Sequence, residues 1–166
     1  MEWSIIWRKL RKCLLNQPKC PEHPQYPHVK TLVLKVINDI ISVNENGVIV
    51  RSHRTYHEDF IEAERFEIWW KHLISKGSAS LIPGDENNPH PWRSCIIGAI
   101  FATCLPDIIK VKDKSVIQLI KRNLKSRVAE WREMALSLHA EPFAEDVEES
   151  WRWMSREYAE RKLGFR

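Results

Sequence analysis

Cysteine and histidine side chains that can bind a metal ion gather in two short stretches of this chain. Residues 16–28, NQPKCPEHPQYPH, bring a cysteine and two histidines into a proline-rich linker, and two more histidines precede a run of carboxylates at 58–59. Thiolate sulfur and imidazole nitrogen are the ligands of structural zinc sites. The candidate ligands are Cys20, His23, His28, His53 and His57.

The spacing of these residues matches no zinc finger. Cys13 precedes Cys20 in the pattern Cys13-x6-Cys20-x2-His23-x4-His28, but we expect Cys13 on a helix. His53 and His57 are four residues apart, so a helix would allow them to share a metal; the alternative is that both are exposed before a helix opened by Glu58 or Asp59. We expect no metal and no other cofactor.

Basic side chains form the second candidate site. Residues 1–30 carry six basic and two acidic side chains, and residues 110–139 carry eight and three. In 2–15, tryptophan and aliphatic residues lie on one helical face and cations on the other, which is typical of a helix in a membrane interface. An ordinary core helix remains the alternative. The expected anion-binding residues are Arg8, Lys9, Arg11, Lys12, Lys114, Lys121, Arg122 and Lys125.

Eight tryptophans are many for 166 residues, and they indicate a well-buried core or an aromatic binding face. We expect Trp3, Trp7 and Trp153 to contact a partner. Cys95 and Cys104 lie in an apolar segment and are expected to be core thiols. The chain has no glycine-rich phosphate loop and no Gly-x-Ser-x-Gly motif, so we do not expect an enzyme.

Hydrophobic periodicity predicts a mainly α fold: a single helical domain over 1–166, with at most one short β-hairpin near 43–56. Residues 1–28, a basic amphipathic helix followed by a proline-rich linker, are expected as an N-terminal appendage. About six helices are predicted, at 2–15, 30–43, 58–76, 91–105, 114–138 and 144–163. We take 58–76 as the central helix, ended by Gly77. For 29–43 a strand is the alternative, because the run is β-branched and is followed by Asn44-Glu45-Asn46-Gly47.

These features favour a non-enzymatic intracellular interaction protein that docks on membrane phosphates or an acidic partner through its N-terminal helix. One alternative is a nucleic-acid-binding protein that uses a basic helix at 110–132, and another is an adaptor that binds protein partners, or itself, through tryptophan. A basic amphipathic N-terminus on a small helical body resembles viral matrix proteins in architecture, which would imply a matrix or accessory role. No run of about 18 apolar residues predicts a membrane span. Four cysteines in a chain this long predict a reduced protein rather than a disulfide framework.

Overall fold

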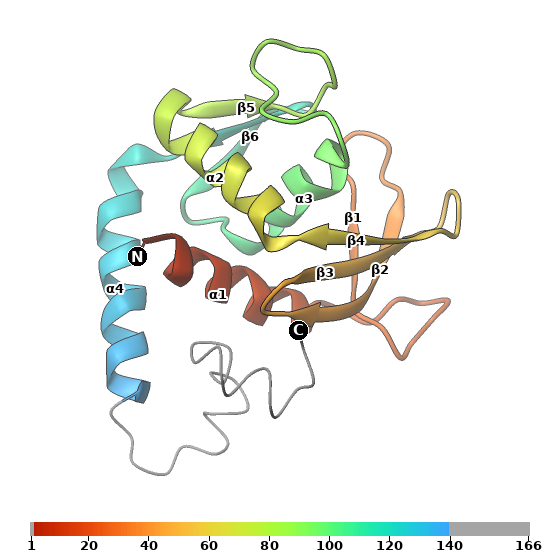
Figure 1. Cartoon of the computed structure of the whole chain (residues 1–166), viewed down its shortest axis with the longest axis horizontal. Coiled ribbons are helices and arrows are strands. Elements are labelled where there is room, and N and C mark those ends of the chain that lie inside the picture. Colours follow the sequence, from red (N-terminus) through yellow and green to blue (C-terminus); the bar gives the residue numbers. More distant parts are fainter. Residues whose placement is uncertain (1, 140–166) are drawn as a thin grey trace.

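The computed structural model describes residues 2–139, with side-chain environments for residues 3–134. The described residues form four helices and seven strands in two antiparallel sheets (Figure 1). The elements are α1 (Glu2–Leu15), β1 (His28–Lys30), β2 (Ile37–Asn44), β3 (Gly47–Ser52), β4 (Glu58–Glu62), α2 (Ala63–Lys76), β5 (Ser78–Ser80), α3 (Ser94–Cys104), β6 (Ile109–Asp113), β7 (Val116–Leu119) and α4 (Lys121–His139).

The two sheets lie on different sides of the helices. One is a meander with the strand order β1-β2-β3-β4, and the other has the order β5-β7-β6. In Figure 1, α1 lies between α4 and the four-stranded sheet, while α2 and α3 separate α1 from the smaller sheet. Helix α1 therefore contacts all three other helices as well as β2.

The main core forms where these layers meet. Ile6, Leu10 and Leu14 of α1 are fully buried, as are Phe66 of α2 and Phe101 of α3. Residues 2–15 do form the predicted helix, but its apolar face packs inside the protein, as the core-helix alternative expects. Helix α1 is thus part of the hydrophobic core.

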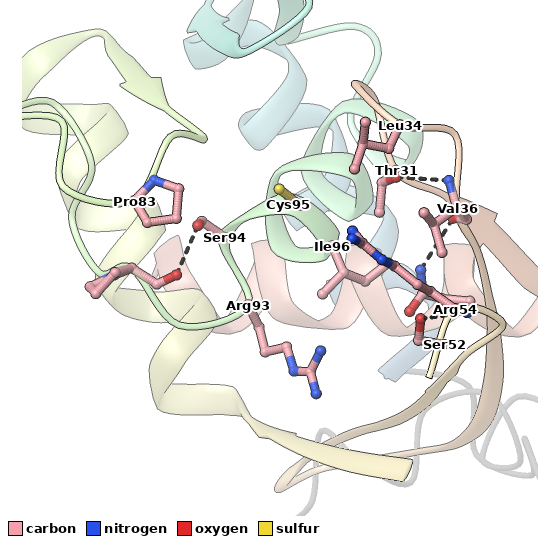
Figure 2. Close-up of a pocket in the computed structure, with 12 residues that line it drawn as sticks. Thr31, Leu34, Val36, Ser52, Arg54, Pro83, Arg93, Ser94, Cys95 and Ile96 are labelled. Atoms are coloured by element: carbon pink, nitrogen blue, oxygen red, sulfur yellow. Dashed lines mark hydrogen bonds between the residues drawn. The ribbon is translucent and has the colours of Figure 1, made fainter. Parts of the chain in front are cut away.

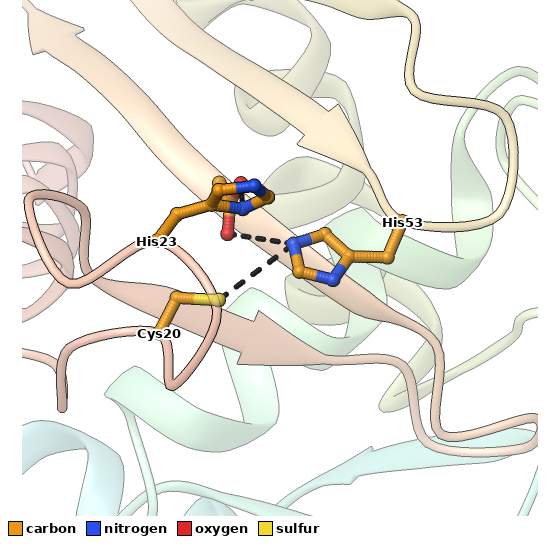
Figure 3. A group of neighbouring side chains, drawn as sticks. Cys20, His23 and His53 are labelled. Atoms are coloured by element: carbon orange, nitrogen blue, oxygen red, sulfur yellow. Dashed lines mark hydrogen bonds and ion pairs between the residues drawn. The ribbon is translucent and has the colours of Figure 1, made fainter.

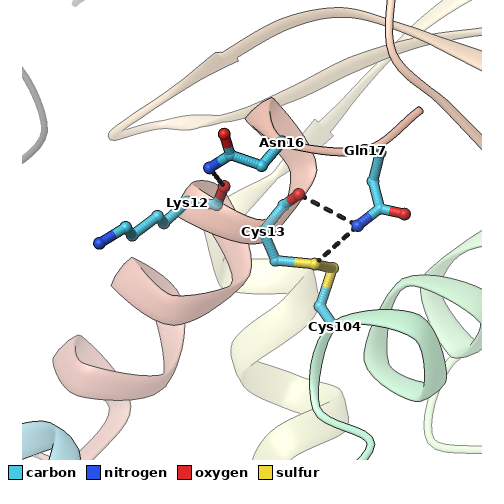
Figure 4. The surroundings of a disulfide bond; sticks show 5 residues. All are labelled: Lys12, Cys13, Asn16, Gln17 and Cys104. Carbon is cyan, nitrogen blue, oxygen red and sulfur yellow. Dashed lines mark hydrogen bonds between the residues drawn. A yellow bond between two sulfur atoms is a disulfide. The ribbon is translucent and has the colours of Figure 1, made fainter. Parts of the chain in front are cut away.

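A disulfide joins α1 to the end of α3. Cys13 and Cys104 are bonded, with their Cα atoms 5.5 Å apart, and the side-chain amide of Gln17 donates to the carbonyl oxygen and the sulfur of Cys13 (Figure 4). The prediction that Cys104 is a free core thiol is therefore wrong. The bond links two helices that are distant in sequence, because α1 and α3 pack side by side.

The prediction of a mainly α fold is wrong, since the described residues form seven strands in two antiparallel sheets beside the four helices. Residues 30–43 form no helix; a loop leads into β2, which pairs with β3 through the Asn44–Gly47 turn. The Asn44 side chain accepts hydrogen bonds from the turn amides of Asn46 and Gly47. A bulge between Ile40 and Ser42 sets the buried Ile40 and Val43 three residues apart, which imitates helical spacing.

The predicted central helix at 58–76 divides into a strand and a shorter helix. Strand β4 pairs with β3, and along it Phe60 is exposed while Ile61 is fully buried, the alternation of a strand. Helix α2 begins only at Ala63, so the carboxylates of Glu58 and Asp59 are not in its first turn. The predicted stop is confirmed, because Gly77 has φ +82° at the C-cap.

The long helix predicted at 114–138 is also shorter than expected. Residues 109–119 form the β6–β7 hairpin, and α4 begins at Lys121. The helix predicted at 91–105 is present as α3. The helix predicted at 144–163, together with Trp153, lies outside the described residues.

Candidate metal centre

Three of the five candidate ligands lie together, with an aspartate that the sequence analysis did not select. Cys20 and His23 belong to the proline-rich segment, Asp39 to β2, and His53 follows β3 (Figure 3). Each of these four side chains offers one potential ligand atom, and the four atoms all lie within 4.8 Å of one another. We call this group the metal centre.

The proline-rich segment folds back on itself to present its two ligands. The Cys20 amide donates to the Tyr26 carbonyl at 2.7 Å, and the Tyr26 amide donates to the His23 carbonyl at 2.9 Å. A bridge between Lys19 and Pro27 closes the loop. Prolines restrict the backbone of this segment, so it can hold a tight turn without regular secondary structure.

The distances within the metal centre are short. Cys20 Sγ lies 3.7 Å from His53 Nε2, which lies 2.9 Å from Asp39 Oδ1. His23 Nδ1 lies 2.8 Å from Asp39 Oδ2. Cys20 and Asp39 are fully buried, whereas the His23 side chain is 30% exposed. The centre is therefore closed on the side of Cys20 and Asp39 and is most open to solvent at His23.

His23 Nδ1 makes no directed hydrogen bond despite its close approach to Asp39. The atom is buried, and its contact with the carboxylate lacks hydrogen-bond direction. A buried polar atom without a partner is unfavourable, and in native proteins it usually has an explanation such as a bound ion. An ion among the four side chains would give Nδ1 a partner.

Two backbone amides approach the Cys20 sulfur, but its surroundings as a whole favour the neutral thiol. Burial and a hydrogen bond with Asp39 raise the pKa of the Cys20 thiol, while backbone hydrogen bonds from His23 and Glu22 lower it. The net direction is upward. A thiol followed two and three residues later by amides directed at its sulfur resembles one arm of a metal-binding turn, and a cation would complete the stabilisation of the thiolate.

Groups around the ligands orient them. Arg51 Nη2 donates to Asp39 Oδ2 at 3.0 Å, Glu22 Oε2 lies 3.6 Å from His53 Nδ1, and the Tyr56 ring stacks on the His53 ring at 5.8 Å. For Asp39, burial raises the pKa, but hydrogen bonds from Cys20, His53 and Arg51 together lower it, so the carboxylate is favoured. A carboxylate on the outer nitrogen of a histidine is a common second contact in metal sites.

This arrangement suits a tetrahedral zinc ion. Zinc bonds of about 2.3 Å to sulfur and about 2.0–2.1 Å to nitrogen place those two atoms about 3.5 Å apart. The observed distance between Cys20 Sγ and His53 Nε2 is 3.7 Å. The two distances from the Asp39 oxygens to the nitrogens of His53 and His23 would have to lengthen by about 0.5 Å, to match the separation of a nitrogen and an oxygen bound to the same zinc ion.

The same residues do not suit nucleophilic catalysis. Cys20, His53 and Glu22 form a chain of thiol, imidazole and carboxylate with separations of 3.7 and 3.6 Å. However, Cys20 is fully buried, and burial raises the pKa of its thiol. A catalytic thiol needs thiolate character and access to substrate.

The other two candidate ligands lie apart from the centre. His28 Nδ1 contacts the Pro18 carbonyl at 2.7 Å, and His57 is exposed in the turn before β4. Asp39 was not among the candidates, because its segment was predicted to be a helix. Two sequence features could have identified the site. The spacing Cys20-x2-His23 places two ligands on one turn, and the strand alternative for 29–43 would have placed a carboxylate near that turn.

The expected anion-binding residues divide into buried and exposed groups. Arg8 and Arg11 of α1 are only 6% and 3% exposed, and burial lowers the pKa of both guanidinium groups. Lys9 is half-buried with its ammonium 5.1 Å from the centre of the Trp131 ring, and Lys12 is exposed. The remaining four are exposed at the β6–β7 turn and along α4: Lys114, Lys121, Arg122 and Lys125. Their binding to an anion stays a prediction.

Trp3 and Trp7, two of the three tryptophans predicted to contact a partner, lie at the edge of the core. Trp7 is buried, and its indole N–H donates to the Glu45 carbonyl at 3.0 Å. Trp3 is half-buried and stacks on Trp7. No helix among the described residues is long and apolar enough to cross a membrane.

A separate hollow of 270 Å³ lies beside the N-terminus of α3 (Figure 2). Asn38 and Ser52, which precede two of the metal-centre residues in sequence, belong to its lining. Cys95 also lines it and is the only other free cysteine of the chain. This thiol is exposed and lies outside the metal centre, so it offers a matched control for Cys20.

No known protein family, curated protein or solved structure matches this chain.

Proposed function

We propose that this chain is a non-enzymatic binding protein whose fold is stabilised by one zinc ion, held by Cys20, His23, Asp39 and His53. The observation that carries the proposal is the convergence of one sulfur, two imidazole nitrogens and one carboxylate within 4.8 Å. The donors come from three separate segments: the proline-rich loop, β2 and the turn after β3.

The choice of zinc follows from the donors. Calcium and magnesium prefer oxygen ligands, whereas a thiolate with two imidazoles suits zinc and other transition metals. A thiolate and a carboxylate neutralise the two positive charges of the ion, and the histidines bind as neutral imidazoles. The buried site then carries no net charge, which favours its placement in the protein interior.

A structural role is favoured over a catalytic one. Structural zinc ions have four protein ligands, whereas catalytic zinc ions have three and an open position for water or substrate. Here four donors from the protein are available. The ion would have no free tetrahedral position.

The proline-rich segment needs such an anchor. Among residues 16–27, only Cys20 and Pro27 are buried, so this segment contributes little apolar surface to the core. Its attachment through Cys20 and His23 to β2 and β3 would replace the missing hydrophobic anchoring with metal bonds. The segment would then present a fixed surface for a partner, which agrees with a binding function.

Metal analysis of the purified chain tests the proposal. We expect about one zinc ion per chain, and cobalt substitution should give the absorption bands of tetrahedral coordination with a thiolate. Cys20→Ser should remove most of the bound metal, while Cys95→Ser should retain it. A histidine pair provides the same comparison, because His23→Gln should lose metal and His28→Gln should keep it.

Two results would overturn the proposal. One is a wild-type chain that binds no zinc or cobalt when it is refolded with either metal. The other is a Cys20→Ser variant that binds as much metal as the Cys95→Ser variant. Circular dichroism of each variant separates loss of metal from loss of folding.

A further inference from the structure

A second polar cluster lies at the opposite end of the fold, beside the smaller sheet. It is a hollow of about 580 Å³ where α2 ends, β6 and β7 pair and α4 begins. We call it the basic hollow. Its lining consists of Lys76, Gly77, Ser78, Lys110, Gln118, Leu119, Ile120, Lys121 and Arg122.

The sheet register brings these residues together from three distant parts of the chain. Gln118 of β7 is paired with Ser78 of β5 on one side and with Lys110 of β6 on the other, so the three form one row across the sheet. The Leu119 amide donates to the Gly77 carbonyl at 2.8 Å, which fixes the start of α4 against the end of α2. Residues remote in sequence therefore share one concave surface.

Four cations line the basic hollow, and no acidic side chain does. Within the described residues, none of Lys76, Lys110, Lys121 and Arg122 forms an ion pair. Asp107, which precedes α4, and Glu130 of α4 both form ion pairs with Arg127 instead. The positive charge of the hollow is thus uncompensated by the described part of the protein.

The position of two of these cations is electrostatically unfavourable without an anion. Lys121 and Arg122 occupy the first turn of α4, which contains no acidic residue. The N-terminal end of a helix carries partial positive charge, so cations there destabilise the helix and anions stabilise it. An anion in the hollow would interact favourably with both cations and with the end of the helix, and would so offset this repulsion.

The lining also restricts the kind of anion. It contains no aromatic side chain, so a nucleobase would find no stacking surface, and single-stranded nucleic acids commonly need one. A volume of about 580 Å³ falls within the range of small-molecule sites. Four cations around a compact space match several phosphate groups on one small framework better than a single phosphate.

We infer that the basic hollow binds a compact ligand that carries two or more phosphate groups, with Lys76, Lys110, Lys121 and Arg122 as the phosphate-contacting residues. Such a group occurs free in solution and on the headgroup of a phosphorylated lipid. This inference does not depend on the metal centre, which lies against the other sheet.

Titration calorimetry with inositol trisphosphate tests the free form, and co-sedimentation with vesicles containing phosphatidylinositol bisphosphate tests the lipid form. We expect the wild-type chain to bind at least one of these probes. The double variant Lys121→Gln/Arg122→Gln should weaken binding at least about tenfold, because two charge-assisted contacts are lost. Lys30→Gln/Lys35→Gln, which removes two exposed cations from β1 and the loop after it, should leave affinity within about twofold.

The two probes distinguish the sources. Binding to inositol trisphosphate without vesicle binding identifies a soluble ligand, and binding to bisphosphate vesicles but not to phosphatidylserine vesicles of equal charge identifies a lipid headgroup. Failure of both probes, or equal loss in the two double variants, overturns the inference. Binding to duplex RNA or DNA without binding to either probe also overturns it, in favour of a nucleic-acid backbone.

Metal content, measured for every variant, separates this inference from the proposed zinc site. The Lys121→Gln/Arg122→Gln variant should keep the metal content of the wild-type chain. The Cys20→Ser variant, where it remains folded, should keep its affinity for the phosphate probe.

Discussion

The metal centre and the basic hollow contrast in how their charges are balanced. At the metal centre, the buried Asp39 is surrounded by Cys20, His53 and Arg51, and the surrounding groups favour its negative charge. In the basic hollow, four exposed cations line one surface without an acid among the lining residues. Removal of one partner from a compensated buried cluster leaves another group unpaired and destabilises the fold. An uncompensated exposed cluster repels itself slightly and favours an external ligand.

This contrast predicts opposite signs for mutations at the two places. Removal of a charged or metal-binding group from the metal centre should destabilise the protein. Removal of a cation from the basic hollow should leave stability unchanged or raise it, while it weakens ligand binding.

The largest effect is expected from loss of the metal. Cys20→Ser, or treatment of the wild-type chain with a strong chelator, should lower the free energy of unfolding by about 3–5 kcal/mol, because it breaks a buried charged cluster. For a chain of this size, that corresponds to a fall of roughly 10 °C in the melting temperature. Differential scanning calorimetry with and without chelator measures it.

Chelation of the Cys20→Ser variant is the control for this prediction. Once the metal is absent, the chelator should change its melting temperature no further. An equal fall in the variant and in the wild-type chain would show that the chelator acts elsewhere.

The disulfide should have the next largest effect. Cys13→Ala/Cys104→Ala opens a covalent loop with a sequence separation of 91 residues and should lower the free energy of unfolding by about 2–4 kcal/mol. Urea unfolding without added oxidant or reductant measures the difference in the free energy of unfolding between the variant and the wild-type chain. Metal content should stay the same, because neither cysteine belongs to the metal centre.

This variant sharpens the comparison between the two uses of cysteine in the chain. Cys13 constrains α1 against α3, whereas Cys20 would constrain the proline-rich loop against the larger sheet through the proposed metal ion. If the double variant also lost its metal, the metal centre would depend on the disulfide between α1 and α3. The two regions would then unfold as one unit and not independently.

The smallest effect is expected at the basic hollow, and its sign is reversed. Arg122→Gln removes a cation from the first turn of α4 and should raise the free energy of unfolding by about 0.3–1 kcal/mol. Urea unfolding at low ionic strength measures the gain, which salt should reduce by screening. Lys35→Gln, at an exposed loop position outside any helix terminus, should change stability by less. A clear loss of stability in Arg122→Gln would mean that Arg122 has a structural partner.

Some elements of the fold were predictable from the sequence, and others were not. The helix at 2–15, the stop at Gly77 and the apolar helix that begins near Ser94 were predictable, because each depends on local spacing or backbone preference. The strands at 37–44 and 58–62 were not, since a bulge at Ile40/Ser42 and carboxylates at 58–59 imitate helical patterns. Cys20, His23 and His53 were among the five candidates chosen by residue type, but their grouping with Asp39 depends on the pairing of β2 with β3.

The sequence by itself determined the chemical types available: soft metal ligands in a proline-rich segment and an excess of cations at 110–139. Only the tertiary structure decided which of them meet. Strand pairing places Asp39 opposite Arg51 and near His53, and β7 brings Lys110 to the end of α2 and the start of α4. Such contacts depend on sheet register and helix packing, which are set by the burial of apolar residues throughout the chain and not by the polar residues that form the sites.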